Sequence, residues 1–214
     1  MTSKIIDISQ PIRPGIPVWP GDTPFSIEEN WTISDECPVL VSRITMSTHT
    51  GTHADAHSHY NKDGVDTASR ELAPYVGRCV VVDAIAGTDA VGCDDVLATI
   101  DEYGDSPERV LIRTFPKFPH DAWPEPFRPI SALLIDELGK RGCRLIGTDA
   151  PSIDPETSKT LEAHHAVHRH DMAILEGLVL DHVVAGEYEL IALPLRFEKA
   201  DASPVRAILR PLAG

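Results

Sequence analysis

The alternation of apolar and polar positions along the chain predicts a mixed α/β fold. Apolar and β-branched runs predict strands, and these runs lie at residues 5–8, 39–48, 78–84, 109–114, 144–149, 172–180, 188–194 and 205–209. Apolar residues at helical spacing predict helices at residues 94–103, 130–141 and 154–168. Gly142 marks the end of the second helix, while Asp154 and Pro155 supply an N-cap and a first-turn proline for the third.

Two proline-rich segments interrupt these elements and are predicted to be loops, because proline breaks helices and central strands. Residues 11–24 hold five prolines and surround Trp19. The indole of Trp19 either fills the core or presents a flat surface to an aromatic ligand, and the pattern favours neither. Residues 115–129 hold a further five prolines together with aromatic residues. We expect this long irregular segment to cover an active site or to contact a second subunit.

Length and composition fit a single domain spanning residues 1–214, because 42% of the residues are hydrophobic and no linker divides the chain. The formal net charge is -14, so the surface repels phosphate backbones and no nucleic-acid partner is expected. No apolar run approaches the roughly 20 residues of a membrane span, and the N-terminus lacks the apolar core of a signal peptide. We therefore expect a cytoplasmic protein with no membrane partner.

The cysteines Cys37, Cys79, Cys93 and Cys143 are scattered and form no C-x-x-C pair. This usage is typical of reduced thiols that pack inside a cytoplasmic protein. Any bound metal must therefore be held by histidine and carboxylate side chains.

Residues 49–59 read His-Thr-Gly-Thr-His-Ala-Asp-Ala-His-Ser-His and concentrate the candidate chemistry. If this segment is extended, its side chains alternate between two faces, and one face carries His49, Gly51, His53, Asp55, His57 and His59. A helix would instead separate neighbouring ligand types by about 200°. Gly51 would leave a gap through which an ion or substrate approaches the backbone. Imidazoles with a carboxylate suit Zn²⁺ best, with Mn²⁺, Fe²⁺ or Co²⁺ possible. A structural zinc site and unrelated surface histidines are the alternatives.

A second histidine cluster lies near the end of the third predicted helix, at His164, His165, His168 and His170. On a helix, His164 and His168 share a face and His165 points elsewhere. Glu176 follows inside an apolar run, where a carboxylate needs a cation or strong donors to offset its desolvation. Adding His164 and Glu176 to the first cluster gives a site able to hold two ions with bridging carboxylates. A solvated helix face is the simpler alternative for any one of these histidines.

At these residues the chain resembles the bacterial kynurenine formamidase branch of the metal-dependent cyclase superfamily. The family pattern H-x-G-T-H-x-D-x-P-x-H is matched at His49, Gly51, Thr52, His53, Asp55 and His59. The departure is His57, which stands where the family usually has proline and adds a possible stray ligand. The resemblance runs nearly from end to end and includes segments at residues 7–9, 17–22, 147–154 and 175–178.

The resemblance implies a role for each matched residue. It implies that His49 and His53 bind one metal, that His164 binds another, and that both are bridged by Asp55 and Glu176. It further implies that His59 donates and accepts protons and that Trp19 contacts an aromatic substrate. It also implies two zinc ions per subunit, a swivelling β/β/α fold with a mixed sheet or barrel and flanking helices, and a homodimer.

The reaction implied is hydrolysis of N-formyl-L-kynurenine to L-kynurenine and formate in tryptophan degradation. The chemistry suits such a site, because a metal lowers the pKa of bound water towards ~7 and the hydroxide attacks the formyl carbon. A serine-hydrolase route is not expected, since the chain has no Gly-x-Ser-x-Gly motif. The alternatives are another amidohydrolase of the superfamily, similar to isatin hydrolase, and a non-catalytic metal-binding protein.

Overall fold

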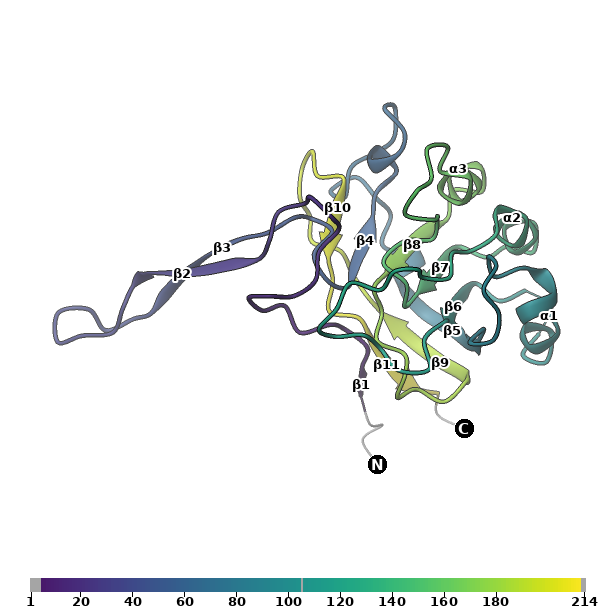
Figure 1. Cartoon of the computed structure of the whole chain (residues 1–214), viewed down its shortest axis with the longest axis horizontal. Helices are drawn as coiled ribbons and strands as arrows, with labels where there is room; N and C mark the ends of the chain where they lie inside the picture. The colour runs from purple at the N-terminus through teal and green to yellow at the C-terminus, as the bar shows by residue number, and fades with distance from the viewer. Residues whose placement is uncertain (1–4, 105, 213–214) are drawn as a thin grey trace.

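The computed structural model describes residues 5–104 and 106–212, which form a nine-stranded mixed sheet, three α-helices and a separate hairpin (Figure 1). The sheet has the order β1-β11-β9-β5-β6-β7-β8-β4-β10. Its strands are β1 (Ile6–Asp7), β4 (His53–Asp55), β5 (Val76–Asp83), β6 (Arg109–Arg113), β7 (Leu145–Thr148), β8 (Ala173–Glu176), β9 (Gly186–Ile191), β10 (Ala202–Pro204) and β11 (Ile208–Pro211). The helices are α1 (Cys93–Asp101), α2 (Ala132–Lys140) and α3 (Glu162–Arg169), and the hairpin joins β2 (Ser26–Trp31) to β3 (Val41–Thr45).

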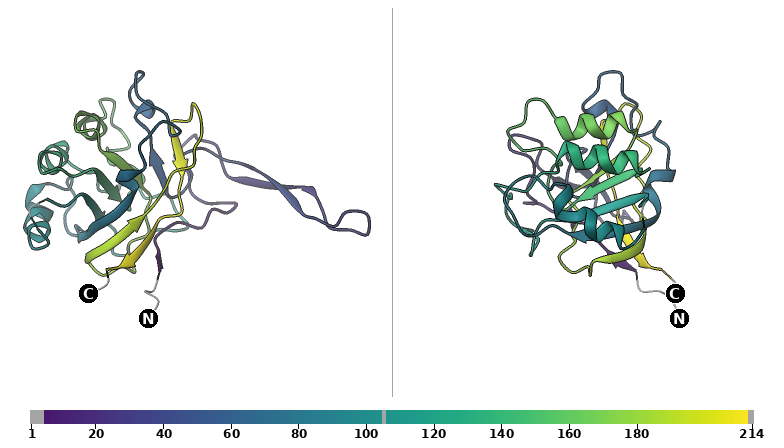
Figure 2. Two further views of the ribbon diagram at one scale, coloured as in Figure 1. Left: turned by 180° about the vertical axis from the view of Figure 1, so that it is seen from behind. Right: turned by 90° about the vertical axis from the view of Figure 1, so that its right-hand side faces the viewer.

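The central strands β5, β6, β7 and β8 are parallel, and the three helices make the crossovers between them. All three helices cover the same face of the sheet (Figure 2). Val80 and Val82 belong to the core beneath the helices, whereas Val81 belongs to a second core on the opposite face. Burial on both faces explains why these strands are nearly continuous apolar runs.

The strands on either side of this parallel centre are antiparallel. Ala54 on β4, Leu190 on β9 and Leu209 on β11 all contribute to the second core, so the sheet curls around it. The prediction of a mixed α/β domain with a mixed sheet and flanking helices is confirmed. Most of the predicted strands and the first two helices are also confirmed within a few residues.

The predicted helix at residues 154–168 begins too early. Residues 155–161 form turns, and Leu161 has a left-handed φ of 48° immediately before α3 begins at Glu162. Asp154 nevertheless accepts hydrogen bonds from the first turn of α3, from the backbone amides of Ala163 and His164. The aspartate therefore serves the helix terminus from a distance rather than as its adjacent N-cap.

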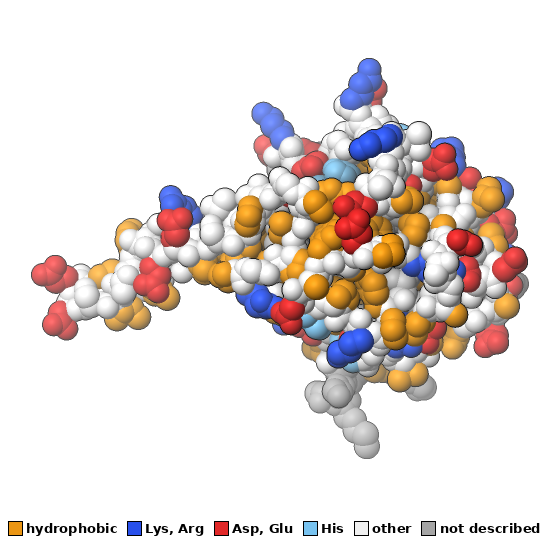
Figure 3. Space-filling view, viewed as in Figure 1, with side chains coloured by type: hydrophobic (Ala, Val, Ile, Leu, Met, Phe, Trp, Pro, Cys, Tyr) orange, Lys and Arg blue, Asp and Glu red, His pale blue; other side chains and the backbone are white. Residues whose placement is uncertain are grey.

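A long arm formed by β2 and β3 projects from the body of the molecule (Figures 1 and 3). Every residue of both strands is exposed. The pattern predicted β3 but not β2, whose Ser-Ile-Glu-Glu-Asn-Trp sequence is polar and interrupted by a register shift. β10 was also not predicted. Among the described residues no helix is long and apolar enough to cross a membrane.

Candidate metal centre

β4 lies between β8 and β10 and carries His53 and Asp55, of which His53 lines a cavity. The two residues alternate on a strand, so their side chains share a face. His53 lies opposite Glu176 in the register of β4 and β8. His53 Nε2 is 3.4 Å from Asp55 Oδ1 and 3.3 Å from Glu176 Oε2. A histidine and two carboxylates therefore meet where two antiparallel strands are paired.

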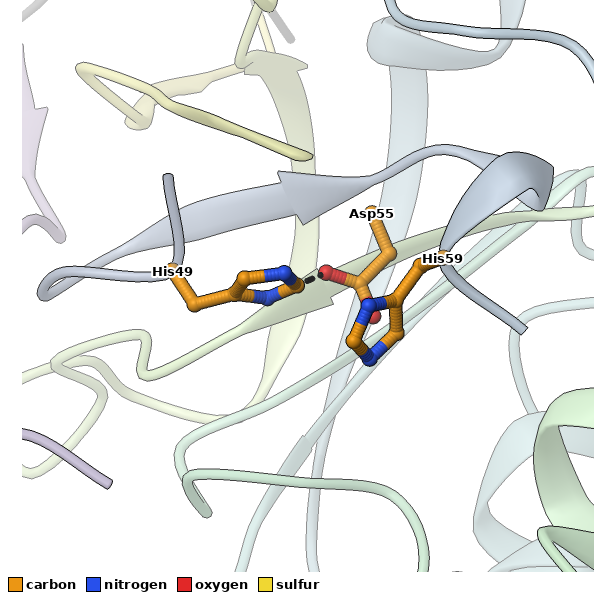
Figure 4. A group of neighbouring side chains, drawn as sticks. All are labelled: His49, Asp55 and His59. Atoms are coloured by element: carbon orange, nitrogen blue, oxygen red, sulfur yellow. Dashed lines mark ion pairs between the residues drawn. The ribbon is translucent and has the colours of Figure 1, made fainter. Parts of the chain in front are cut away.

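Residues 49–59 do not form one extended strand, and that prediction is wrong. The chain turns at Gly51, whose φ of 69° favours glycine. Only residues 53–55 are extended, and a 3₁₀-helix, η1 (His57–His59), follows. His49 and His59 nevertheless approach Asp55 from the two ends of the segment (Figure 4). His49 Nδ1 lies 3.2 Å from Asp55 Oδ1.

His57 does not share the face of Asp55, contrary to the prediction that residues 49–59 are extended. Its Nε2 donates to the carbonyl of Met172 at 3.1 Å, and its Nδ1 lies 3.2 Å from a guanidinium nitrogen of Arg70. The ring also packs against His168, with the ring centroids 4.8 Å apart. The 3₁₀ turn causes this difference, because it rotates successive side chains by about a third of a turn. His57 therefore occupies the space between η1 and the end of α3.

His164 is the member of the second histidine cluster that reaches the carboxylates. Its Nε2 lies 3.4 Å from Asp55 Oδ2 and 3.8 Å from Glu176 Oε1. His168 contacts His57 instead, and His165 is exposed. Each carboxylate thus directs one oxygen towards His53 and the other towards His164.

The three buried or half-buried imidazoles are oriented by acceptors on their outer nitrogens. His49 Nε2 donates to Asp201 at 3.1 Å, His53 Nδ1 to the Gly51 carbonyl at 2.9 Å, and His164 Nδ1 to Asp154 at 2.6 Å. When these rings are neutral, their inner nitrogens carry the lone pairs and face the carboxylates, which is how metal-binding histidines are normally held. Sequence reasoning missed Asp154 and Asp201 as site residues. Asp154 lies in the segment 147–154 that carries the family resemblance, which could have indicated its role. Asp201 lies in no matched segment.

Electrostatics couple these groups strongly. Burial raises the pKa of Asp55, but His49 and His164 outweigh this effect and hold it well below its usual range. Burial lowers the pKa of His49 and His53, but nearby carboxylates raise it to about 9 and about 10, respectively. The pKa of His164 is raised to about 10 by Asp154 and Asp55 against the effect of burial. Without a metal, protons on these rings balance the buried carboxylates.

Both carboxylate oxygens of Asp55 are buried and have no hydrogen-bond donor among the residues that the structure describes. Buried carboxylates without hydrogen bonds are rare, because desolvation of an ion costs several kcal/mol. Either protonated imidazoles or a bound cation must therefore balance the charge of Asp55. Imidazole lone pairs and carboxylate oxygens are also the donors that Zn²⁺ prefers. The residues present therefore fit a divalent metal ion.

The metal centre opens into a cavity of ≈ 290 Å³ whose walls are largely aromatic and proline-rich. Trp19 is half-buried in this wall, and its ring meets Trp123 edge to face with the centroids 5.5 Å apart. Phe118 and Trp123 come from the loop at residues 115–129, so this loop forms part of the cavity wall. Its contact with a second subunit stays a prediction. Trp19 lines the cavity rather than filling the core. His59 also lines this cavity.

Comparison with known proteins identifies relatives over the whole chain. Residues 6–155 match the "Cyclase" family model, described as "putative cyclase". The chain is 56% identical to the kynurenine formamidase of Maricaulis maris (strain MCS10), with 98% of this chain and 99% of the relative covered. It is 52% identical to that of Erythrobacter litoralis (strain HTCC2594), with 98% and 94% covered.

Two solved structures share the fold closely. One, described as a potential metal-dependent hydrolase with cyclase activity, is 29% identical with a TM-score of 0.83, and both chains are covered completely. The other is isatin hydrolase A from Labrenzia aggregata bound to benzyl benzoate, which is 25% identical with a TM-score of 0.84. That match covers 98% of this chain and 94% of the hydrolase.

Proposed function

The chain belongs to the kynurenine formamidase branch of the cyclase family, and on that premise we propose that it hydrolyses N-formyl-L-kynurenine to L-kynurenine and formate in tryptophan degradation. The observation that carries this proposal is the buried Asp55 carboxylate, which is ringed by three imidazoles that line an aromatic cavity. A cavity of this kind accepts an aromatic amide and presents it to the metal centre.

Five residues would hold the metal: His49, His53 and His164 through their inner nitrogens, and Asp55 and Glu176 through their carboxylates. We propose zinc, because the donors are imidazole and carboxylate, although manganese and other divalent ions suit the same donors. Two ions per chain fit the geometry, because each carboxylate offers separate oxygens to the two sides. When bound, the metal supplies a Lewis acid and lowers the pKa of water.

The protein side chains position the substrate and move the proton. Trp19, supported by Trp123, provides the flat surface against which the aryl ring packs. His59 lies at the cavity with its side chain 34% exposed, so it can reach both substrate and solvent. We assign it the proton that the departing aryl amine requires. The half-exposed ring exchanges that proton with water between turnovers.

The direct test is turnover of N-formyl-L-kynurenine by purified, zinc-loaded protein, followed by chromatography of kynurenine and formate. We expect turnover that stops on treatment with a chelator and returns with zinc. Asp55→Asn is the matched control, because it keeps the side-chain shape but removes the charge. Absence of turnover in protein shown to contain zinc would contradict the assignment.

A second candidate is hydrolysis of isatin, which the likeness to an isatin hydrolase supports at 25% identity. The higher identity to kynurenine formamidases, 52–56%, favours the formamide. A panel of formylkynurenine, formanilide and isatin at equal concentration separates the two. We expect isatin to be the poorest of the three substrates, and a preference for isatin would reverse the assignment.

We also propose that the protein is a homodimer that works in the cytoplasm. An isolated two-stranded hairpin is marginal in water, yet the arm exposes Ile27, Trp31 and Ile44 by half or more of their surface. Packing against a second copy would bury these side chains. The four cysteines are free, as is usual in a reducing compartment. Light scattering should give twice the chain mass of 23.4 kDa, and Ile44→Glu should shift it towards the monomer.

A further inference from the structure

Asp201 lies immediately before β10, beside the metal centre but outside the proposed ligand set. Its backbone carbonyl accepts a hydrogen bond from the amide of Ala56 at 2.8 Å, which fixes it to the end of β4. Its Oδ1 accepts from the hydroxyl of Thr48 at 2.9 Å. Its Oδ2 lies 3.1 Å from His49 Nε2 and 3.4 Å from His59 Nδ1. One carboxylate oxygen thus faces two imidazoles.

The contact with His49 determines which nitrogen of that ring is free. Because a carboxylate only accepts, Nε2 of His49 carries a proton, and in the neutral ring Nδ1 keeps its lone pair. That lone pair faces Asp55 Oδ1 at 3.2 Å. An outer carboxylate in this position orients the ring and makes it a stronger metal ligand.

The contact with His59 acts on the proposed proton carrier. The rings of His49 and His59 lie against each other with their centroids 4.2 Å apart, so the anionic oxygen lies beside both. A carboxylate at Nδ1 orients an imidazole with Nε2 directed away from it. The distance of 3.4 Å is long for a hydrogen bond, as is common in enzymes without substrate.

Asp154 is the comparison for Asp201, because its carboxylate contacts His164, another proposed metal ligand, as Asp201 contacts His49. Its Oδ2 accepts from His164 Nδ1 at 2.6 Å, and its remaining contacts are the backbone amides of Ala163 and His164. Asp154 therefore serves a metal ligand and a helix terminus. Asp201 instead contacts a proposed metal ligand, His49, and the proposed proton carrier, His59.

We infer that Asp201 is a positioning residue shared by two functions, holding His49 for the metal and His59 for proton transfer to the leaving amine. Its effect on the metal follows from the fit of the ligand set alone. Its effect on proton transfer rests on the proposed function, so the two parts need separate measurements.

The first measurement is zinc affinity, by competition with a chromogenic chelator. Loss of an outer carboxylate typically weakens metal binding about 10–100-fold. We expect a weakening of that size in Asp201→Asn and also in Asp154→Asn. Thr48→Val, which removes only the hydroxyl that holds Oδ1, should give a smaller change in the same direction and protects the test against misfolding of the aspartate variant. Unchanged affinity in both Asp201→Asn and Thr48→Val overturns the metal part.

The second measurement uses ring-substituted formanilides at saturating zinc. Their amines differ in basicity, and a basic amine depends most on a proton donor. In Asp201→Asn we expect turnover to fall at least about tenfold for the most basic amine and less for the most acidic. Asp154→Asn should keep the wild-type dependence on amine basicity, whatever its overall rate.

The proton-transfer role of Asp201 and the proposed function can fail separately. Equal losses across all formanilides in Asp201→Asn, or the same steepening in Asp154→Asn, overturn the proton-transfer part. If wild-type protein hydrolyses neither formylkynurenine nor any formanilide, the proposed function fails, and with it the proton-transfer part. The zinc measurement still tests the link between Asp201 and His49 in that case.

Discussion

His53 and Glu176 are directly opposite each other on β4 and β8, and their side chains meet with Nε2 3.3 Å from Oε2. Strand register therefore places one histidine and one carboxylate of the metal centre. The backbone amide of Ile153 donates to the other oxygen of Glu176 at 2.8 Å, which limits the rotation of the carboxylate.

We predict two divalent ions per chain when metal is plentiful. Glu176→Gln should lower this number, because it removes one bridging charge, while Asp55→Asn should abolish tight binding. Elemental analysis of dialysed protein measures the number, and anomalous scattering locates the ions. A single ion bound away from His164 and Glu176 would remove the second site from the proposal.

For His59→Ala we predict normal metal content and a loss of formylkynurenine turnover on the order of 10²–10⁴-fold, because aryl amines leave poorly without a proton. Formanilides with electron-poor rings should lose less. The geometry allows a rival role, since ligand atoms of His49, Asp55 and His59 lie within 4.8 Å of one another. Loss of zinc from His59→Ala would show that His59 is a ligand instead.

Trp19→Ala should raise the Michaelis constant for formylkynurenine with little change in zinc content. The ring forms part of the cavity wall and meets Trp123 edge to face, and it is not among the proposed metal ligands. Steady-state kinetics measure the Michaelis constant, and elemental analysis measures the zinc content. An unchanged Michaelis constant would exclude the packing of the substrate ring on Trp19.

We predict that His57→Ala keeps its zinc but loses about 1–3 kcal/mol of stability, because it removes the two hydrogen bonds of the ring, to the Met172 carbonyl and to Arg70. His57→Pro should also keep its zinc. Denaturant unfolding together with metal analysis tests the two variants. Loss of zinc from both would mean that His57 supports the metal centre directly.

The metal-free protein should lose stability as the pH rises. In the folded state the pKa is raised to about 9 for His49 and to about 10 for His53 and His164, compared with 6.5 for an unperturbed histidine. A raised pKa contributes stability that is complete below about pH 6.5 and is lost as the pH rises through about 9–10. The Tm of chelated protein should therefore fall across this range.

Zinc-loaded protein is the matched control for this measurement, because it shares every other titrating group. Its Tm should fall less over the same pH range, since the metal takes the place of the protons on the imidazoles. Parallel curves for the two forms would contradict the link between the raised pKa values and stability.

The sequence was most informative where one physical effect dominates. Strands β5 to β7 are buried on both faces, so their apolar runs were recognisable. β2 has no buried face and β10 has only three residues, and neither produces a periodic signal.

The ligand set was predicted through residue types, although the backbone between them was not. His53 and Asp55 alternate on a strand as expected, whereas His49 and His59 reach the site through a turn and a 3₁₀-helix. The same 3₁₀-helix turns His57 away. Asp201 lies far along the chain and becomes a neighbour of His49 only when β10 pairs with β4.

The pairing of β4 with late strands affects the order in which the sheet and the metal site form during folding. β4 carries two of the five proposed ligands, but it is held between β8 and β10, which come much later in the chain. Contacts between such distant segments form slowly, because long loops must close first. During refolding, tight zinc uptake should therefore lag behind the formation of the parallel strands, measured by a zinc indicator beside far-ultraviolet circular dichroism. The ion would then bind only to chains whose early and late segments have already joined.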